Sequence, residues 1–374
     1  MRKIAMLSSK GRWWTIANVV SQHGSSVRNM CMVKLSDHIG SMDLHVSSRE
    51  RVWSSHRIIC NVQAVSKWLP SMNCIQAYLM INGPLVTFGC ILHLSLCWAV
   101  RVSSSSNPTL STLLQVIIFG MKNFLLLLGI DSMTSSRPDI VVRDKQYEAD
   151  KEVAAHSSWR TVISSVATFT ILETATYNIA KTLGLIQYSR SVENILSADF
   201  IIGRLTFFGT FIIVSFAVEI MFDFFHYWTH RFLHLQPALY KSLHSLHHHN
   251  SNPTVYHTFN DTICGTIVTN TIPHLLALFL FSILFFRPIH HSEHSLLLVY
   301  KTFVEISGHS GKELGKASSF PQWKWLPVFF GIELYTCDHH SHHRNPKTNF
   351  SKRFVLWDKV FSTLLRNKNI EKAE

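Results

Sequence analysis

Apolar residues form five long runs between residues 79 and 286, separated by shorter polar stretches. A helix needs about 20 mostly apolar residues to cross a bilayer, and each run reaches that length. Charged residues interrupt the second, third and fourth runs, and the third is the weakest. We predict spans at 79–100, 110–130, 161–183, 200–222 and 263–286, with Lys122 in the second, Glu173 in the third, and Arg204 and Glu219 in the fourth.

Residues 1–70 show no sustained apolar period. They are rich in Ser and carry ten Lys and Arg against three Asp and Glu, without the basic start and continuous apolar stretch of a signal peptide. We interpret them as a poorly ordered cytosolic extension. The predicted organisation is an extension at 1–70, N-terminal membrane helices at 71–190, a histidine-rich domain at 191–365 and a tail at 366–374.

The composition is typical of a membrane protein. Hydrophobic residues make up 47% of the chain and charged ones 16%, whereas soluble domains average about 25% charged. The net charge is +12, but basic residues flank the apolar runs, which favours an anionic membrane surface over nucleic acid as a partner. The seven Cys include no CxxC pair, which favours a reducing, cytosol-facing site. The sequence predicts an all-α, integral membrane helical bundle with about four to six membrane helices.

The loops differ in their content of Lys and Arg, and this difference predicts an orientation. The 131–160 loop carries five basic residues, whereas the loops expected on the other side carry Arg101 and Arg190. Because Lys and Arg accumulate on the cytosolic side, we expect the N-terminus and the 131–160 loop to be cytosolic. Four crossings then return the chain to the cytosol near Asp223, where the histidines begin.

Histidine is concentrated in one part of the chain, with 17 of 23 between His226 and His343. The first cluster contains His226, His230 and His234. Residues four apart on a helix share one face, so His226 and His230 can bind one metal ion. Asp223 lies one turn earlier and can accept the outer ring N–H of a ligand, fixing its tautomer.

Two further clusters repeat an HxxHH spacing, with a lone histidine between them. One HxxxH pair is usually only the polar face of a helix, but two HxxHH copies in the same chain predict metal binding. The copies are His244, His247, His248 and His339, His342, His343; the lone histidine is His309, with Glu305 one turn earlier, and Asp338 precedes the second copy. We interpret the other histidines as satisfied or interfacial (His93, His274, His290) or favour structural roles for them (His257, His291, His294).

Eight or nine imidazoles exceed the three protein ligands of a catalytic zinc, so two metal ions are implied. Imidazole suits Zn, Cu, Fe and Ni and does not select iron. The chain lacks the HExxH of zinc proteases and the paired Glu-x-x-His motifs of soluble di-iron bundles. After these exclusions, the remaining interpretation is a histidine-rich cap on the cytosolic side in which nitrogen ligands alone hold two metal ions. A zinc-dependent membrane hydrolase, a histidine-lined metal transporter and a b-type cytochrome are the alternatives, although transporter and haem ligands lie within the membrane rather than beyond helix ends.

For one site to form, the second and third clusters must lie on the same membrane face. The apolar run 263–286 separates them, and the only return segment, 295–306, is short for an ordinary span. We therefore expect a re-entrant hairpin or a deep, tilted pair of helices. His309 should emerge at the end of the return segment and face the site.

These motifs resemble the sterol desaturase/fatty acid hydroxylase superfamily, whose signature is HxxxH, HxxHH and HxxHH. The neighbouring sequence segments also match: HYWTHR from His226, GHSG around His309, ELYTCDH ending at His339, and FVLWDKVF from Phe354. The resemblance covers about residues 200–365, and residues 1–150 show none. Many members also carry a His–Pro shortly after the second box, where this chain reads TFNDT from Thr258.

The resemblance implies a di-iron enzyme of the endoplasmic reticulum with its active site facing the cytosol. Such enzymes hydroxylate, desaturate or oxidise sterol or fatty-acyl lipids, using O2 and electrons from NAD(P)H, often through cytochrome b5 and its reductase. By position in the motifs, the implied iron ligands are His226, His230, His244, His247, His248, His309, His339, His342 and His343, with Asp223, Glu305 and Asp338 supporting them.

Overall fold

The computed structural model of the chain describes residues 72–103, 108–137, 140, 159–188, 199–312 and 319–366. All of them lie in the second of two compact units, Pro70–Glu374. The predicted extension at 1–70 and nearly all of the predicted tail fall outside the described residues, as do most of the basic residues of the 131–160 loop.

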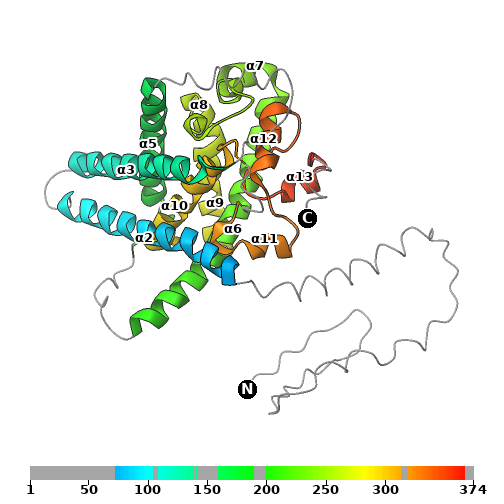
Figure 1. The fold of residues 1–374 in the computed structure, drawn as a ribbon. Coiled ribbons are helices and arrows are strands. Elements are labelled where there is room, and N and C mark those ends of the chain that lie inside the picture. Colours follow the sequence, from blue (N-terminus) through cyan, green and yellow to red (C-terminus); the bar gives the residue numbers. More distant parts are fainter. Residues whose placement is uncertain are drawn as a thin grey trace, which may run out of the picture. The chain divides into compact units, whose positions relative to one another are not determined.

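Long helices make up most of the described part of the chain, which confirms the predicted all-α membrane protein (Figure 1). Within the described residues, four helical segments are long and apolar enough to cross a membrane: Ile75–Arg101, Pro108–Thr134, Thr206–Leu235 and Ile263–Leu284. The first four predicted runs correspond, in order, to α2 (Met72–Ser103), α3 (Pro108–Thr134), α5 (Trp159–Thr182) and α6 (Asp199–Leu235). The helix at the third run, α5, is not among the four membrane-length segments.

Two charges in the predicted spans pair with each other. The Nζ atom of Lys122 on α3 lies 2.5 Å from Oε1 of Glu173 on α5, and both side chains are almost fully buried. The Lys122 ammonium also donates to Oγ1 of Thr302 at 2.8 Å. A buried charge is costly unless it is paired and hydrogen-bonded, so this contact explains how both helices carry a charge at this depth.

The last membrane-length segment combines α8 (Ile263–Thr266), a π-helical turn η4 (Ile267–Thr271) and α9 (Ile272–Leu284). The chain then turns and forms strand β2 (Ile289–His290), which pairs in parallel with β1 (Ile186–Gln187). Helix α10 (His291–Gly308) follows and is buried along most of its length. The predicted return segment is therefore a helix of 18 residues, longer than expected, with His309 at its C-cap.

Helices α2 and α10 approach each other very closely. A Cβ atom placed on Gly89 of α2 would lie 2.4 Å from Cδ1 and 3.3 Å from Cα of Leu296 on α10. Only glycine leaves room for such an approach without a shift of the neighbouring helix. Further along the same interface, the Tyr300 hydroxyl donates to Oδ1 of Asn82 at 2.6 Å.

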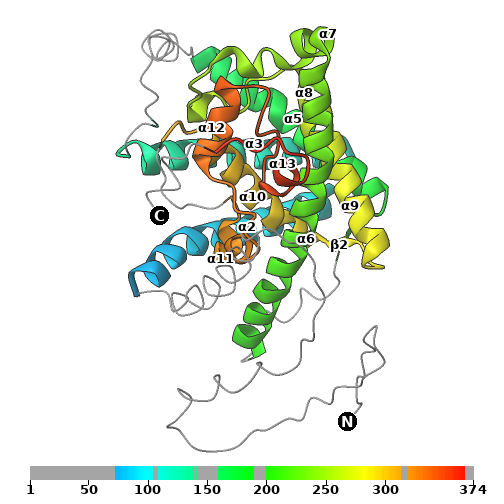
Figure 2. The ribbon, with the colours of Figure 1, turned by 90° about the vertical axis from the view of Figure 1, so that its right-hand side faces the viewer.

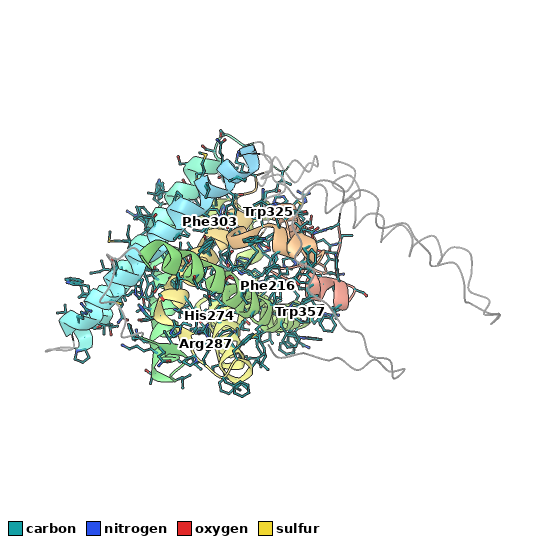
Figure 3. The ribbon with its side chains drawn as sticks, turned by 90° about the horizontal axis from the view of Figure 1, so that it is seen from below. Phe216, His274, Arg287, Phe303, Trp325 and Trp357 are labelled. Atoms are coloured by element: carbon teal, nitrogen blue, oxygen red, sulfur yellow. The ribbon has the colours of Figure 1, made fainter. Side chains whose placement is uncertain are left out.

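The histidine-rich part of the chain consists of short elements around the ends of α6 and α10. Figure 2 shows α12 toward the end of α6 that leads into α7. Figure 3 shows Phe216 of α6 near Trp357. The Phe216 ring packs with centroid distances of 5.3 Å against Phe320 and against Phe354. The short elements are α7 (Pro237–Leu239), η1 (Tyr240–His244), η2 (His247–His249), η3 (Val255–His257), η5 (Pro321–Trp323), α11 (Trp325–Phe329), α12 (Thr336–Arg344) and α13 (Leu356–Val360).

Candidate metal centre

Five histidines from four elements form a first group, which we call the five-histidine group. Its members are His230 and His234 of α6, His244 of η1, His248 of η2 and His342 of α12, and one ring nitrogen from each lies within 4.8 Å of all the others. The Nε2 atom of His230 is at the centre. It lies 2.9 Å from Nε2 of His244, 3.1 Å from that of His342 and 3.2 Å from that of His234.

Four other histidines form a second group, the four-histidine group. It contains His247 of η2, His309 at the end of α10, and His339 and His343 of α12. The Nε2 atom of His309 lies 3.0 Å from Nε2 of His339 and 3.3 Å from that of His247. The two groups adjoin, because the ring of His343 lies 4.7 Å from that of His248 in the five-histidine group.

The spacing within each group fits one metal ion. Two imidazole nitrogens that bind one ion at 2.0–2.1 Å lie about 2.9–3.4 Å apart. The closest nitrogens of both groups lie at 2.9–3.3 Å. Both ring nitrogens of His248 and of His343 are buried without a hydrogen-bond partner. Such orphaned atoms are costly in a folded protein, and a bound metal ion would satisfy one nitrogen of each ring.

Backbone carbonyl groups orient several of these rings. A carbonyl oxygen can only accept, so the Nδ1 atom facing it must carry the proton, and the lone pair of Nε2 then points into the group. The Nδ1 donations are from His230 to Phe350 at 2.9 Å, from His309 to Glu305 at 2.8 Å and from His342 to Thr348 at 2.7 Å.

Eight of the nine ligands predicted from the sequence lie in the two groups, and His226 is outside them. Its Nδ1 atom donates to the carbonyl of Thr269 at 2.7 Å, and its ring borders a small cavity of about 20 Å³ together with His230 and His244. Its assignment as a ligand stays a prediction. The structure adds His234, which follows His230 by four residues, so helical spacing alone was a usable signal.

Residues 215–363 match the fatty acid hydroxylase family. Both histidine groups lie inside this segment. We call this segment the hydroxylase-family domain, after the family that it matches. The resemblance seen in the sequence to the sterol desaturase/fatty acid hydroxylase superfamily is thereby confirmed.

Several similar proteins match about two fifths of the chain. Fatty acid hydroxylase vlmA of Lecanicillium sp is 29% identical over 38% of this chain and 40% of its own length. Sphingolipid C4-hydroxylase SUR2 of Saccharomyces cerevisiae is 29% identical over 42% and 41%, and methylsterol monooxygenase erg25A of Aspergillus fumigatus is 31% identical over 41% and 46%. The chain thus spans less than half of the length of these relatives. No solved structure matches the chain.

In the hydroxylase-family domain, Asp223 supports a loop rather than a ring. Its carboxylate accepts the backbone N–H groups of Lys352 at 2.7 Å, Arg353 at 2.9 Å and Phe354 at 3.1 Å. Asp223 therefore does not make the predicted contact with the outer ring nitrogen of a ligand. The loop it holds begins at Phe350, whose carbonyl orients His230, so Asp223 acts on the five-histidine group through the backbone.

A second buried carboxylate, not singled out from the sequence, holds the same loop. Asp358 accepts the backbone N–H of Phe350 at 2.8 Å, that of Ser351 at 2.9 Å and the hydroxyl of Thr363 at 2.7 Å. Asp358 lies in the FVLWDKVF segment that contributed to the family resemblance, and this segment was the signal in the sequence that could have identified it. Together, Asp223 and Asp358 fix both ends of the segment that orients His230.

Asp338 and Glu305 also act on the framework of the domain. Asp338 accepts the backbone N–H of Tyr335 at 3.0 Å, capping α12, and Arg366 donates to its carboxylate at 3.2 Å. The Glu305 carboxylate pairs with Lys352 and accepts from Arg353. Burial alone would raise the pKa of Glu305, but these two cations outweigh it and lower the pKa to about 2.

A larger cavity of about 440 Å³ reaches the four-histidine group of the domain at His309 and His339. Apolar side chains from three helices contribute to its wall, among them Ile81 of α2, Ile130 of α3 and Phe303 of α10. Charged groups line it as well, namely Arg137, Lys324, Glu305, Lys352 and Arg353. An apolar molecule bound in this cavity would lie beside the four-histidine group.

The histidines make the metal-free domain sensitive to acid. Burial lowers the pKa of His309 and of His342 to about 4, whereas an imidazole in the unfolded chain has a pKa of about 6.5. Between these values the unfolded chain binds more protons than the folded one. The free energy of unfolding should therefore keep its full value above about pH 6.5 and decrease as the pH drops toward about pH 4.

Denaturant titrations of chelator-treated protein in detergent, from neutral to acidic pH, measure this effect. Metal-loaded protein is the control and should keep its midpoint over more of the range, because the ion holds the rings unprotonated. A metal-free chain of constant stability down to pH 4 would contradict the prediction.

Proposed function

We propose that the chain is a membrane-bound lipid oxygenase that holds two iron ions, one in each histidine group. The observation that carries the proposal is the meeting of a two-ion histidine site with a largely apolar cavity of about 440 Å³ at His309 and His339. A transporter for metal ions has no need of such a cavity beside its binding site.

The residues of the chain provide the setting for this chemistry. The five-histidine group would hold one ion and the four-histidine group the other. When bound, iron supplies the activation of O2 needed to attack an unactivated C–H bond. The carbonyls of Phe350, Glu305 and Thr348 keep the rings in one tautomer and orientation, and the cavity walls hold the substrate and exclude water.

The proposed substrate is a sterol or a fatty-acyl lipid, which the chain hydroxylates, desaturates or oxidises at a methyl group. The relatives support this class, because their names refer to fatty acids, sphingolipids and methylsterols. The four membrane-length helical segments of the described residues also support a lipid substrate, because a protein embedded in the bilayer is surrounded by lipids.

The proposed electron source is NAD(P)H, delivered by cytochrome b5 and its reductase. The proposed location is the endoplasmic reticulum, with the metal centre facing the cytosol. The basic residues of the 131–160 loop support this orientation, since Lys and Arg accumulate on the cytosolic side of membrane proteins.

The test is turnover by the full chain in lipid nanodiscs. Protein with measured metal content is supplied with NADPH, cytochrome b5, its reductase and a membrane lipid extract, with and without O2. The proposal expects two irons per chain and a lipid that gains oxygen or loses hydrogen only when both O2 and NADPH are present. Zinc as the bound metal, with lipids that remain unoxidised, would reject it and favour the hydrolase or transporter alternative.

Filling the cavity should stop turnover while leaving the metals in place. Val304 lines the cavity on α10, five residues before His309. Val304→Trp is expected to lower turnover by about 10-fold or more, because a substrate held away from its reacting geometry loses rate steeply. Iron content and substrate conversion are measured on the same sample.

Ile213→Trp is the matched control for this substitution. Ile213 lies on the membrane-length part of α6, is 67% exposed and does not line the cavity. It should keep both iron and turnover. Equal turnover in the Val304 variant and this control would show that the lipid binds elsewhere.

A further inference from the structure

A third cluster of metal-ligating side chains lies outside the two histidine groups. It consists of His93 and Cys97 of α2 and His291, the first residue of α10, and one ligand atom from each lies within 4.8 Å of the others. Helix α10 has 18 residues and is therefore about 27 Å long. Since His309 lies at the opposite end of α10, the cluster is distant from the candidate metal centre.

The cluster forms from local helix geometry and one helix contact. His93 and Cys97 are four residues apart and share one face of α2. The Sγ atom of Cys97 lies 3.8 Å from Nε2 of His93 and 3.8 Å from Nδ1 of His291. A zinc ion bound to sulfur at 2.3 Å and nitrogen at 2.0–2.1 Å would separate those atoms by about 3.5–3.8 Å.

The ring nitrogen of His291 that faces away from the cluster has a hydrogen-bond partner, as is usual for histidines that bind metals. Its ring is buried, and its Nε2 atom is 2.9 Å from the hydroxyl of Tyr177. The ring of Tyr188 stacks on it with centroids 4.3 Å apart. A hydrogen bond on one ring nitrogen fixes the tautomer and orientation in which the other nitrogen binds a metal.

The helices that contribute the three ligands are held together beside the cluster. Gly89 lies one turn before His93 and makes the close contact with Leu296, a little more than one turn after His291. This contact leaves little freedom for α2 and α10 to separate, so the ligand atoms are already near their bound positions. Such preorganisation lowers the cost of binding.

We propose that His93, Cys97 and His291 bind one Zn²⁺ ion that joins α2 to α10. A thiolate with two imidazoles is a ligand set that zinc favours. Binding releases the thiol proton of Cys97 to solvent, and three protein ligands leave one coordination position open. The sequence interpretation of His93 as satisfied or interfacial, and of His291 as structural, is replaced by a ligand role. The site is independent of the proposed oxygenase function.

Cobalt provides the test, because Co²⁺ bound to a thiolate gives a charge-transfer absorption band that Co²⁺ bound only to imidazole lacks. The full chain in nanodiscs is stripped with a chelator and titrated with Co²⁺. Both groups of the candidate metal centre offer only histidine, so a thiolate band cannot come from either of them. We expect a band that saturates and that Zn²⁺ displaces.

Two cysteine variants distinguish the site from other thiols. Cys97→Ser should abolish the band, whereas Cys90→Ser should retain it, since Cys90 is a half-buried cysteine on the same helix but outside the cluster. A wild-type chain that gives no band, or a band that persists in Cys97→Ser, overturns the proposal.

A second measurement uses the unmodified chain and does not depend on the folding of any variant. N-ethylmaleimide modifies thiols, and mass spectrometry of the peptides reports each cysteine separately. Zn²⁺ should slow the modification of Cys97 by about tenfold or more, because the bound thiolate is protected, and should leave Cys90 unaffected. Equal rates at Cys97 with and without Zn²⁺ would overturn the proposal.

Discussion

His230→Ala is expected to remove the ion of the five-histidine group and to abolish lipid turnover. The Nε2 atom of His230 lies within 3.2 Å of the same atom in three other members of the group. Changes around a metal ligand already cost about 10- to 100-fold, so loss of this central ligand should lower turnover by about 100-fold or more. The measurements are metal content by mass spectrometry and conversion of the lipid.

His249→Ala is the control for this result. His249 belongs to the same short helix as His247 and His248, but it is exposed and lies outside both groups. Its loss should change neither the metal content nor the turnover. A His230 variant that keeps two ions per chain and the wild-type rate would refute the assignment of the group.

Asp223→Ala should have the largest effect on the stability of the domain. Asp223 is fully buried and accepts three backbone N–H groups. A buried donor left without an acceptor costs about 1–3 kcal/mol, so the free energy of unfolding should fall by about 3 kcal/mol or more. Metal affinity should also fall, because the loop that orients His230 loses its anchor. Denaturant titration and metal titration measure the two effects.

Two further variants provide stability losses with which that of Asp223→Ala can be compared. Asp223→Asn keeps one oxygen for Lys352 and Arg353 but turns an NH2 group toward Phe354, so its stability should lie between wild type and Asp223→Ala. Asp131→Ala on α3 removes a less buried carboxylate that accepts from Tyr256, and should cost less than about 1 kcal/mol. If Asp223→Ala cost no more than Asp131→Ala, the loop would not depend on this carboxylate.

The sequence predicted the helical membrane architecture and most members of the two histidine groups, because both depend on local spacing. A span appears as a run of apolar residues, and HxxxH or HxxHH places imidazoles on one side of a short element. The division of the histidines into two groups could not be predicted. It depends on how η2 and α12 meet, so that His247 and His248, neighbours in the chain, belong to different groups.

The supporting carboxylates show the same limit. Asp223 was expected to contact a ring because it lies one turn before His226. Its actual partners lie about 130 residues later in the chain, and no local pattern relates the two segments. Likewise, Lys122 and Glu173 each count against a span when taken alone, although in the fold each neutralises the other.

The position of His342, 112 residues after His230, affects how the protein is made. Among the described elements of the domain, synthesis delivers all those from α6 to α11 before α12 leaves the ribosome. Until then the five-histidine group lacks one member and the four-histidine group lacks two. A nascent or prematurely terminated chain that ends before α12 therefore lacks part of the ligand set of both groups, and neither group is complete until α12 has been made.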